Sequence, residues 1–184
     1  MKVLAISGSL RAASINAAFC RAAARLAPSP LQVSLFDGLR ALPLFNPDLE
    51  ANPPRSVQEF RAAVAEARAL IIASPEYAHG ITGVMKNALD WLVSFEGFID
   101  KPVAVVNTSA RAKHADDALR EVLRTMSAHI LSEASVTLPL LGSCTTEEAM
   151  LSSAEVAKQI RSLLTALAVA VSGDGESGPA FPIA

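Results

Sequence analysis

The sequence predicts an open, doubly wound α/β fold in which a parallel sheet is covered by helices on both faces. Strand-length apolar segments alternate with helical segments five times along the chain. The strand segments are continuous apolar runs, as expected for strands that are buried on both faces. Because crossovers are right-handed, few topologies remain, and we expect a five-stranded parallel sheet of order 2-1-3-4-5.

Length and composition narrow the class of protein. The 184 residues fit a single domain over residues 1–171, followed by a flexible, Ser/Gly-rich tail over 172–184. Hydrophobic residues make up 51% of the chain, yet the longest apolar runs fall well short of the ~20 residues of a membrane span. The first residues form a strand pattern and lack the long apolar region of a signal peptide, so we expect a cytoplasmic protein.

Charge and cysteine content exclude further classes. The formal net charge of −2 argues against a nucleic-acid-binding surface. Cys20 and Cys144 are the only cysteines and lie far apart, so neither a disulfide framework nor a four-ligand zinc site is available. We therefore expect reduced thiols and no metal site.

The N-terminal half supplies three of the expected strands. Pro28 and Pro30 end the first helix, and residues 37–55 form a proline-bearing connection that is too long for a turn. Apolar periodicity predicts strands at 2–7, 31–36 and 69–74, and helices at 16–26 and 57–67.

The C-terminal half completes the alternating pattern. It contains predicted helices at 83–93 and 115–127 and predicted strands at 102–108 and 134–138. Thr145 and Glu148 have the spacing of a capping box at the start of a last helix. One apolar stripe then continues toward Val171, formed by Val156, Ile160, Leu163, Leu164 and Leu167.

The loop after the first strand, residues 7–16, has the composition of an anion site. It offers serine hydroxyls, an amide and the arginine fork of Arg11, all just before a helix N-terminus. One glycine is too few for a dinucleotide-binding turn, and no P-loop sequence is present. The pattern therefore favours a terminal phosphomonoester, and the alternative interpretation is a polar turn with a serine N-cap.

The same loop resembles a known signature. Residues 8–16, Gly-Ser-Leu-Arg-Ala-Ala-Ser-Ile-Asn, resemble the phosphate-binding run G-S-L-R-x-x-S-x-N of the NAD(P)H-dependent FMN reductases. Residues 75–91 resemble that family's run P-E-Y-N-x-x-x-P-G-x-L-K-N-A-x-D-W, and residues 41–49 resemble its linker. The likeness spans roughly residues 1–170 and implies a flavodoxin-like three-layer sandwich.

The resemblance also implies roles for residues. The phosphate of FMN would be bound by the first loop, its flat ring would lie along residues 75–80, and its far end would meet the loop after the fourth strand. His79 is the candidate proton donor to a reduced acceptor, with an exposed loop histidine as the alternative. Trp91 is a candidate subunit contact, with a core tryptophan as the alternative. The implied cofactor residues are Ser9, Leu10, Arg11, Ser14, Asn16, Pro75, Glu76, Tyr77, Ala78, His79, Gly80 and Ser109.

Three positions depart from the family pattern. Ala78 replaces an asparagine, and Thr82 replaces a proline, which predicts a less rigid loop. Residues 107–114 contain no glycine, whereas the family often has a glycine-rich turn there. Side chains in this turn would crowd the flavin, or Ser109 and Arg111 would contact its far end or a nicotinamide nucleotide phosphate. Lys113 is a further candidate for the nicotinamide nucleotide phosphate.

The expected function is therefore an FMN-dependent NAD(P)H oxidoreductase. NADH or NADPH would deliver hydride to FMN, and a quinone, azo compound, free flavin or metal oxyanion would then be reduced. The resemblance implies a homodimer or homotetramer without nucleic-acid or membrane partners. The alternatives are a non-catalytic or electron-shuttling FMN protein and, more remotely, a phosphate-ester hydrolase that uses the serine and arginine loop.

Overall fold

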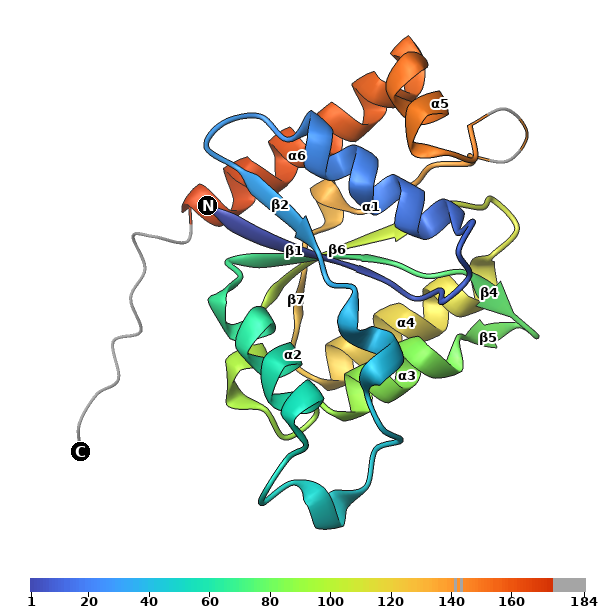
Figure 1. Cartoon of the computed structure of the whole chain (residues 1–184). Helices are drawn as coiled ribbons and strands as arrows, with labels where there is room; N and C mark the ends of the chain where they lie inside the picture. The colour runs from blue at the N-terminus through green and yellow to red at the C-terminus, as the bar shows by residue number, and fades with distance from the viewer. Residues whose placement is uncertain (141, 143, 174–184) are drawn as a thin grey trace.

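A computed structural model describes residues 1–140, 142 and 144–173, and it has the predicted α/β architecture (Figure 1). The central sheet is parallel, and its strand order matches the expected 2-1-3-4-5 arrangement with the fifth position divided between two short strands. Across the sheet the strands are β2 (Gln32–Leu35), β1 (Lys2–Ser7), β3 (Ala69–Ala73) and β6 (Pro102–Asn107), followed by β7 (His129–Ile130) and β8 (Val136–Thr137).

The predicted fifth strand over 134–138 is present in shortened form as β8, whereas the sequence did not predict β7, which shares the fifth position. β7 pairs with the beginning of β6 and β8 pairs with its end, with a 3₁₀ turn at Ser132–Ala134 between them. At the break, Ser135 Oγ accepts a hydrogen bond from Val105 N (3.0 Å) and donates one to Leu131 O (2.8 Å). A serine hydroxyl therefore accepts the backbone hydrogen bond in the middle of β6 that a partner strand would otherwise accept.

Helices cover both faces of the sheet (Figure 1). Their ends lie within about one turn of the predicted bounds. One face carries α1 (Ile15–Leu26), α5 (Glu147–Ser152) and α6 (Ala154–Gly173), and the other carries α2 (Arg55–Glu66), α3 (Gly83–Asp90) and α4 (Lys113–Thr125). Alternate residues of β1 serve the two cores, since Val3 and Ala5 face α1 and α6 while Leu4 and Ile6 face the opposite layer. No helix among the described residues is both long and apolar enough to cross a bilayer.

The C-terminal helices begin differently from the prediction. The N-cap of α5 is Thr146, whose Oγ1 accepts from Ala149 N (3.2 Å), so the cap lies one residue later than the expected Thr145–Glu148 box. A second helix, α6, follows and buries most of the predicted apolar stripe. It continues to Gly173, two residues beyond the expected boundary at 171, and residues 174–184 of the expected tail lie outside the described residues.

The long connection between β2 and α2 packs against α3. Pro43 O accepts hydrogen bonds from Asn87 Nδ2 and Trp91 Nε1, both at 2.9 Å, and Asn87 Oδ1 accepts one from Phe45 N. The Phe45 and Trp91 rings meet edge to face with centroids 5.1 Å apart. Trp91 is fully buried, so its interpretation as a surface contact is wrong and the core interpretation is correct.

Candidate functional site

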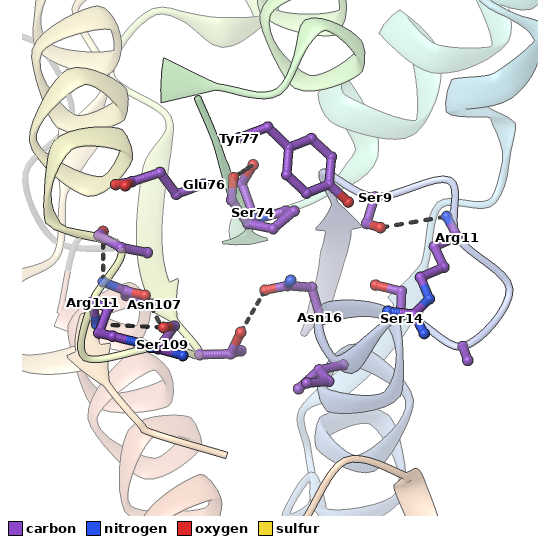
Figure 2. Close-up of a pocket in the computed structure, with 15 residues that line it drawn as sticks. Ser9, Arg11, Ser14, Asn16, Ser74, Glu76, Tyr77, Asn107, Ser109 and Arg111 are labelled. Carbon is purple, nitrogen blue, oxygen red and sulfur yellow. Dashed lines mark hydrogen bonds between the residues drawn. The ribbon is translucent and has the colours of Figure 1, made fainter. Parts of the chain in front are cut away.

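The carboxyl ends of β1, β3 and β6 border a cleft of about 300 Å³, at the lower end of the usual range for ligand pockets (Figure 2). Three segments line it: the first loop (residues 8–16), the second loop (74–82) and the third loop (107–114). This is the edge at which the sheet changes winding direction, where open α/β folds bind ligands.

The cleft brings together most of the expected cofactor residues. Those that line it are Ser9, Arg11, Ser14, Asn16, Pro75, Glu76, Tyr77 and Ser109. Leu10, Ala78, His79 and Gly80 do not line it. Residues that sequence reasoning did not assign also line it, namely Ala13, Ile15, Ser74, Asn107, Thr108 and Ala112. The sequence could have identified Asn107 and Thr108 as lining residues, because they end a predicted buried strand at the same edge of the sheet.

The first loop is shaped by short local hydrogen bonds. Ser14 is the buried N-cap of α1, and its Oγ accepts from Ala17 N (3.2 Å). Ser9 Oγ accepts from Arg11 N (3.4 Å), whereas the guanidinium of Arg11 is exposed and has no ion-pair partner in the described part of the chain. A helix N-terminus, hydroxyls and one permanent positive charge together suit a phosphate.

The first and second loops touch through Gly8. A Cβ atom at Gly8 would lie 2.3 Å from Ser74 Oγ and 3.1 Å from Ser74 Cα, so only glycine fits this contact. Thr82 Oγ1 donates to Gly8 O (2.7 Å) and accepts from Met85 N (3.3 Å), which makes Thr82 the N-cap of α3. Thr82 thus supplies two hydrogen bonds at the position where the family's proline led us to expect a looser loop.

The second loop folds into a hairpin that the sequence did not predict. β4 (Glu76–Tyr77) pairs antiparallel with β5 (Gly80–Ile81), and the turn residues Ala78 and His79 have φ values of 50° and 59°. Positive φ at both central residues is the geometry of a type I′ turn, which favours asparagine and glycine. Tyr77, 57% exposed, extends from the hairpin over the cleft toward the first loop (Figure 2).

Side chains, in place of glycines, shape the third loop. Asn107 Oδ1 accepts from Ser109 N and Asn107 Nδ2 donates to Ala112 O, both at 3.0 Å. At the floor of the cleft, Thr108 Oγ1 donates to Asn16 Oδ1 (3.0 Å), which connects this loop to α1 (Figure 2). All three of the residues Asn16, Asn107 and Thr108 are buried, so these bonds are shielded from competing water.

The hairpin also contacts the start of α4. Glu76 Oε2 accepts a hydrogen bond from Ala115 N (2.9 Å), so this carboxylate is not simply a solvated loop charge. At the hairpin tip, the His79 ring packs against the His114 ring with centroids 4.5 Å apart and planes inclined by 42°. His79 therefore lies beside α4 and outside the cleft lining.

Among the described residues, neither the Cys20 thiol nor a metal cluster supports the hydrolase alternative. Cys20 is fully buried in α1, and burial raises the pKa of its thiol to about 12. Within the described residues, no group of three or more His, Cys, Asp or Glu side chains is placed to hold a metal ion. The donor set of the cleft instead fits FMN, with a cationic, hydroxyl-rich end for the phosphate and an aromatic hairpin for the ring.

Comparison with known proteins identifies the family. The model of the NADPH-dependent FMN reductase family matches residues 1–140. An NAD(P)H-dependent FMN reductase of Pseudomonas aeruginosa is 37% identical over 142 residues, which cover 74% of this chain and 76% of that protein. A 2-hydroxy-1,4-benzoquinone reductase of Burkholderia sp is 36% identical over 61% of this chain and 62% of that protein. An NADPH:quinone oxidoreductase of Arabidopsis thaliana is 40% identical over 59% of this chain and 58% of that protein.

Solved structures agree on the fold. The flavoenzyme FerB of Paracoccus denitrificans, an NAD(P)H:(acceptor) oxidoreductase, superposes with a TM-score of 0.77 at 24% identity, covering 94% of this chain and 97% of that one. The matched residues 1–140 contain all three loops of the cleft. The chain belongs to the NADPH-dependent FMN reductase family.

Proposed function

We propose that the cleft holds FMN and that this protein passes two electrons from NAD(P)H through FMN to a small quinone-type acceptor. The observation that carries the proposal is the meeting, at one sheet edge, of an anion-binding loop and an aromatic hairpin in a chain of this family. FMN supplies the hydride chemistry when bound, and the protein binds, orients and shields it.

The phosphate would lie against the first loop. Arg11 contributes a charge without an ion-pair partner in the described chain, and Ser9 and Ser14 contribute hydroxyls beside the N-terminus of α1. Arg11 is the arginine of the first loop, and its fork of donors suits the one phosphate group that FMN carries. Leu10 supports this loop through its carbonyl, which accepts a hydrogen bond from Arg40 Nη2 (3.0 Å).

The ring would lie between the hairpin and the third loop. Tyr77 provides an aromatic wall, and Pro75 and Glu76 line the cleft beside it. Ser109 and Arg111 stand on the opposite side, where they can contact the far end of the ring or the phosphates of the nicotinamide nucleotide. Because the cleft is small, NAD(P)H and the acceptor would use the same exposed face in turn, which predicts ping-pong kinetics.

Three finer assignments complete the proposal. The acceptor class is a quinone, supported by the names of the Burkholderia and Arabidopsis relatives. The location is the cytoplasm, where NAD(P)H is available. The assembly is a homodimer or homotetramer, supported by the exposed apolar side chains of Leu44 (84%), Val93 (63%) and Ile99 (57%), which a partner copy would cover.

Steady-state kinetics of the FMN-loaded protein test the proposal. NADPH oxidation is measured at several fixed concentrations of 1,4-benzoquinone, and parallel double-reciprocal lines are expected. A yellow protein that oxidises neither NADPH nor NADH with any acceptor would be an electron shuttle or binding protein. A colourless protein that fails to take up added FMN would overturn the assignment of the cleft.

A further inference from the structure

We propose that Glu76 is a positioning residue that shapes the ring end of the cleft by capping α4, and that it does not bind the flavin through its carboxylate. The proposal rests on the proposed function, since it assigns how the FMN site is held open. It assigns Glu76 a role different from that of the neighbouring Pro75 and Tyr77, although all three residues line the same cleft.

The start of α4 lacks a cap from its own segment. Ala112 occupies the N-cap position, and a methyl side chain cannot accept a hydrogen bond. Glu76 Oε2 fills that role from the hairpin by accepting from Ala115 N, the third residue of the helix, at 2.9 Å. A carboxylate at this position also interacts favourably with the positive end of the helix dipole.

Capping α4 also positions the third loop. Residues 107–112 lead directly into α4, and Asn107 is hydrogen-bonded to both Ser109 and Ala112. Asn107 therefore holds the loop at the end that leaves β6, while Glu76 holds the helix into which it runs. Without glycine, this loop has fewer backbone conformations available, so these two contacts, with the bond from Thr108 to Asn16, define where Ser109 and Arg111 stand.

The hairpin is attached to the other wall by a separate contact. Thr82 Oγ1 donates to Gly8 O at 2.7 Å, which binds the second loop to the first. Loss of the Glu76 contact would consequently loosen the first turn of α4 and the adjoining end of the third loop, while the hairpin stays attached at the phosphate end. The defect is thus expected at the flavin ring and not at its phosphate.

Glu76→Ala tests this geometry through two measurements. Amide hydrogen exchange of the FMN-free protein should become at least several-fold faster at residues 113–117. Titration with FMN and with riboflavin, which lacks the phosphate, should show dissociation constants for both raised about tenfold, so that their ratio is unchanged. Glu59→Ala is the matched control, because Glu59 is an exposed helical glutamate that pairs with Arg55 on its own helix.

A second variant distinguishes capping from direct contact. Adding Ala112→Ser to Glu76→Ala restores a local N-cap, and we expect it to recover both slow exchange at residues 113–117 and most of the flavin affinity. Glu76→Gln keeps an acceptor oxygen and should retain most of the protection, which covers the case in which Glu76→Ala fails to fold.

Two results would overturn the proposal. One is unchanged exchange at the start of α4 in Glu76→Ala or, where that variant does not fold, a complete loss of protection there in Glu76→Gln. The other is a loss of flavin affinity that the Ala112→Ser change does not repair, which would place Glu76 in contact with the flavin. If the parent protein binds no flavin, the proposed function fails instead, and the exchange measurement still reports whether Glu76 caps α4.

Discussion

The two ends of the cleft are built from different kinds of contact. At the phosphate end, the first loop is shaped by residues within three positions of each other, such as Ser14 with Ala17 and Ser9 with Arg11. At the ring end, contacts between distant segments position the walls: Glu76 joins the hairpin to α4 through Ala115, and Thr108 joins the third loop to α1 through Asn16. Because these contacts are local, the phosphate end can be predicted from the sequence. The ring end depends on contacts between segments that only the fold brings together.

The largest expected effect comes from removing the charge at the phosphate end. Arg11→Ala should weaken FMN binding by about 10- to 100-fold, because a hydrogen bond to a charged partner contributes about 1.5–3 kcal/mol. Riboflavin binding should not change, since riboflavin has no phosphate. Fluorescence titration measures both affinities, and Arg25→Ala is the control, because Arg25 lies at the far end of α1 and pairs with Glu147 of α5. Equal losses for both ligands would contradict the division into two ends.

The next largest effect concerns the contact that joins the two ends. Asn16→Ala removes the acceptor for the buried Thr108 hydroxyl and should lower the free energy of unfolding by about 1–3 kcal/mol. Urea denaturation of the FMN-free protein measures this change. Combining it with Thr108→Val gives a double-mutant cycle, and additive losses in that cycle would show that the two side chains do not interact.

A smaller effect of opposite sign is expected at the hairpin tip. Ala78→Gly should raise the free energy of unfolding by about 0.5–1 kcal/mol, because alanine is strained at a φ of 50°. Thermal unfolding measures the gain. Ala12→Gly, in the exposed first loop, is the control and should not stabilise the protein, since Ala12 does not have a positive φ. A lower melting temperature for Ala78→Gly would refute the left-handed turn.

The smallest expected signal reports on the rigidity of the phosphate-end helix. In a Cys144→Ser background, Cys20 should resist iodoacetamide at pH 8, because a pKa of about 12 leaves about one thiol in ten thousand ionised and burial blocks access. Reactivity should appear only in denaturant. Rapid labelling of the native protein would mean that α1 opens readily.

The overall fold and the phosphate loop could be predicted from sequence because their signals are local. Buried parallel strands give unbroken apolar runs, and the residues from Gly8 to Asn16 lie within one short segment. The break in the fifth strand escaped prediction because it depends on Ser135 reaching Val105 in another strand. The cap of α5 was misplaced by one residue because Thr145 and Thr146 are adjacent and chemically alike.

The ring end could be predicted only in part. The hairpin was not predicted because Ala78 and His79 occupy the two turn positions where asparagine and glycine are typical of a type I′ turn. Thr82 was interpreted from the proline it replaces, and its bond to Gly8 is visible only once the two strand ends meet. The glycine-free third loop looked like an obstacle because Glu76 reaches the start of α4 from another segment, and the local bonds of Asn107 to Ser109 and Ala112 were not recognised in the sequence.

Trp91 and Tyr77 have a practical consequence, because they are the chain's only tryptophan and only tyrosine. Trp91 is buried against the connection that contains Pro43 and Phe45, whereas Tyr77 stands exposed over the cleft. Intrinsic fluorescence excited at the red edge, where only tryptophan absorbs, will therefore follow detachment of the 37–55 connection from α3. Tyrosine absorbance will follow ligand entry, so the native chain carries two separate optical reporters without added dyes.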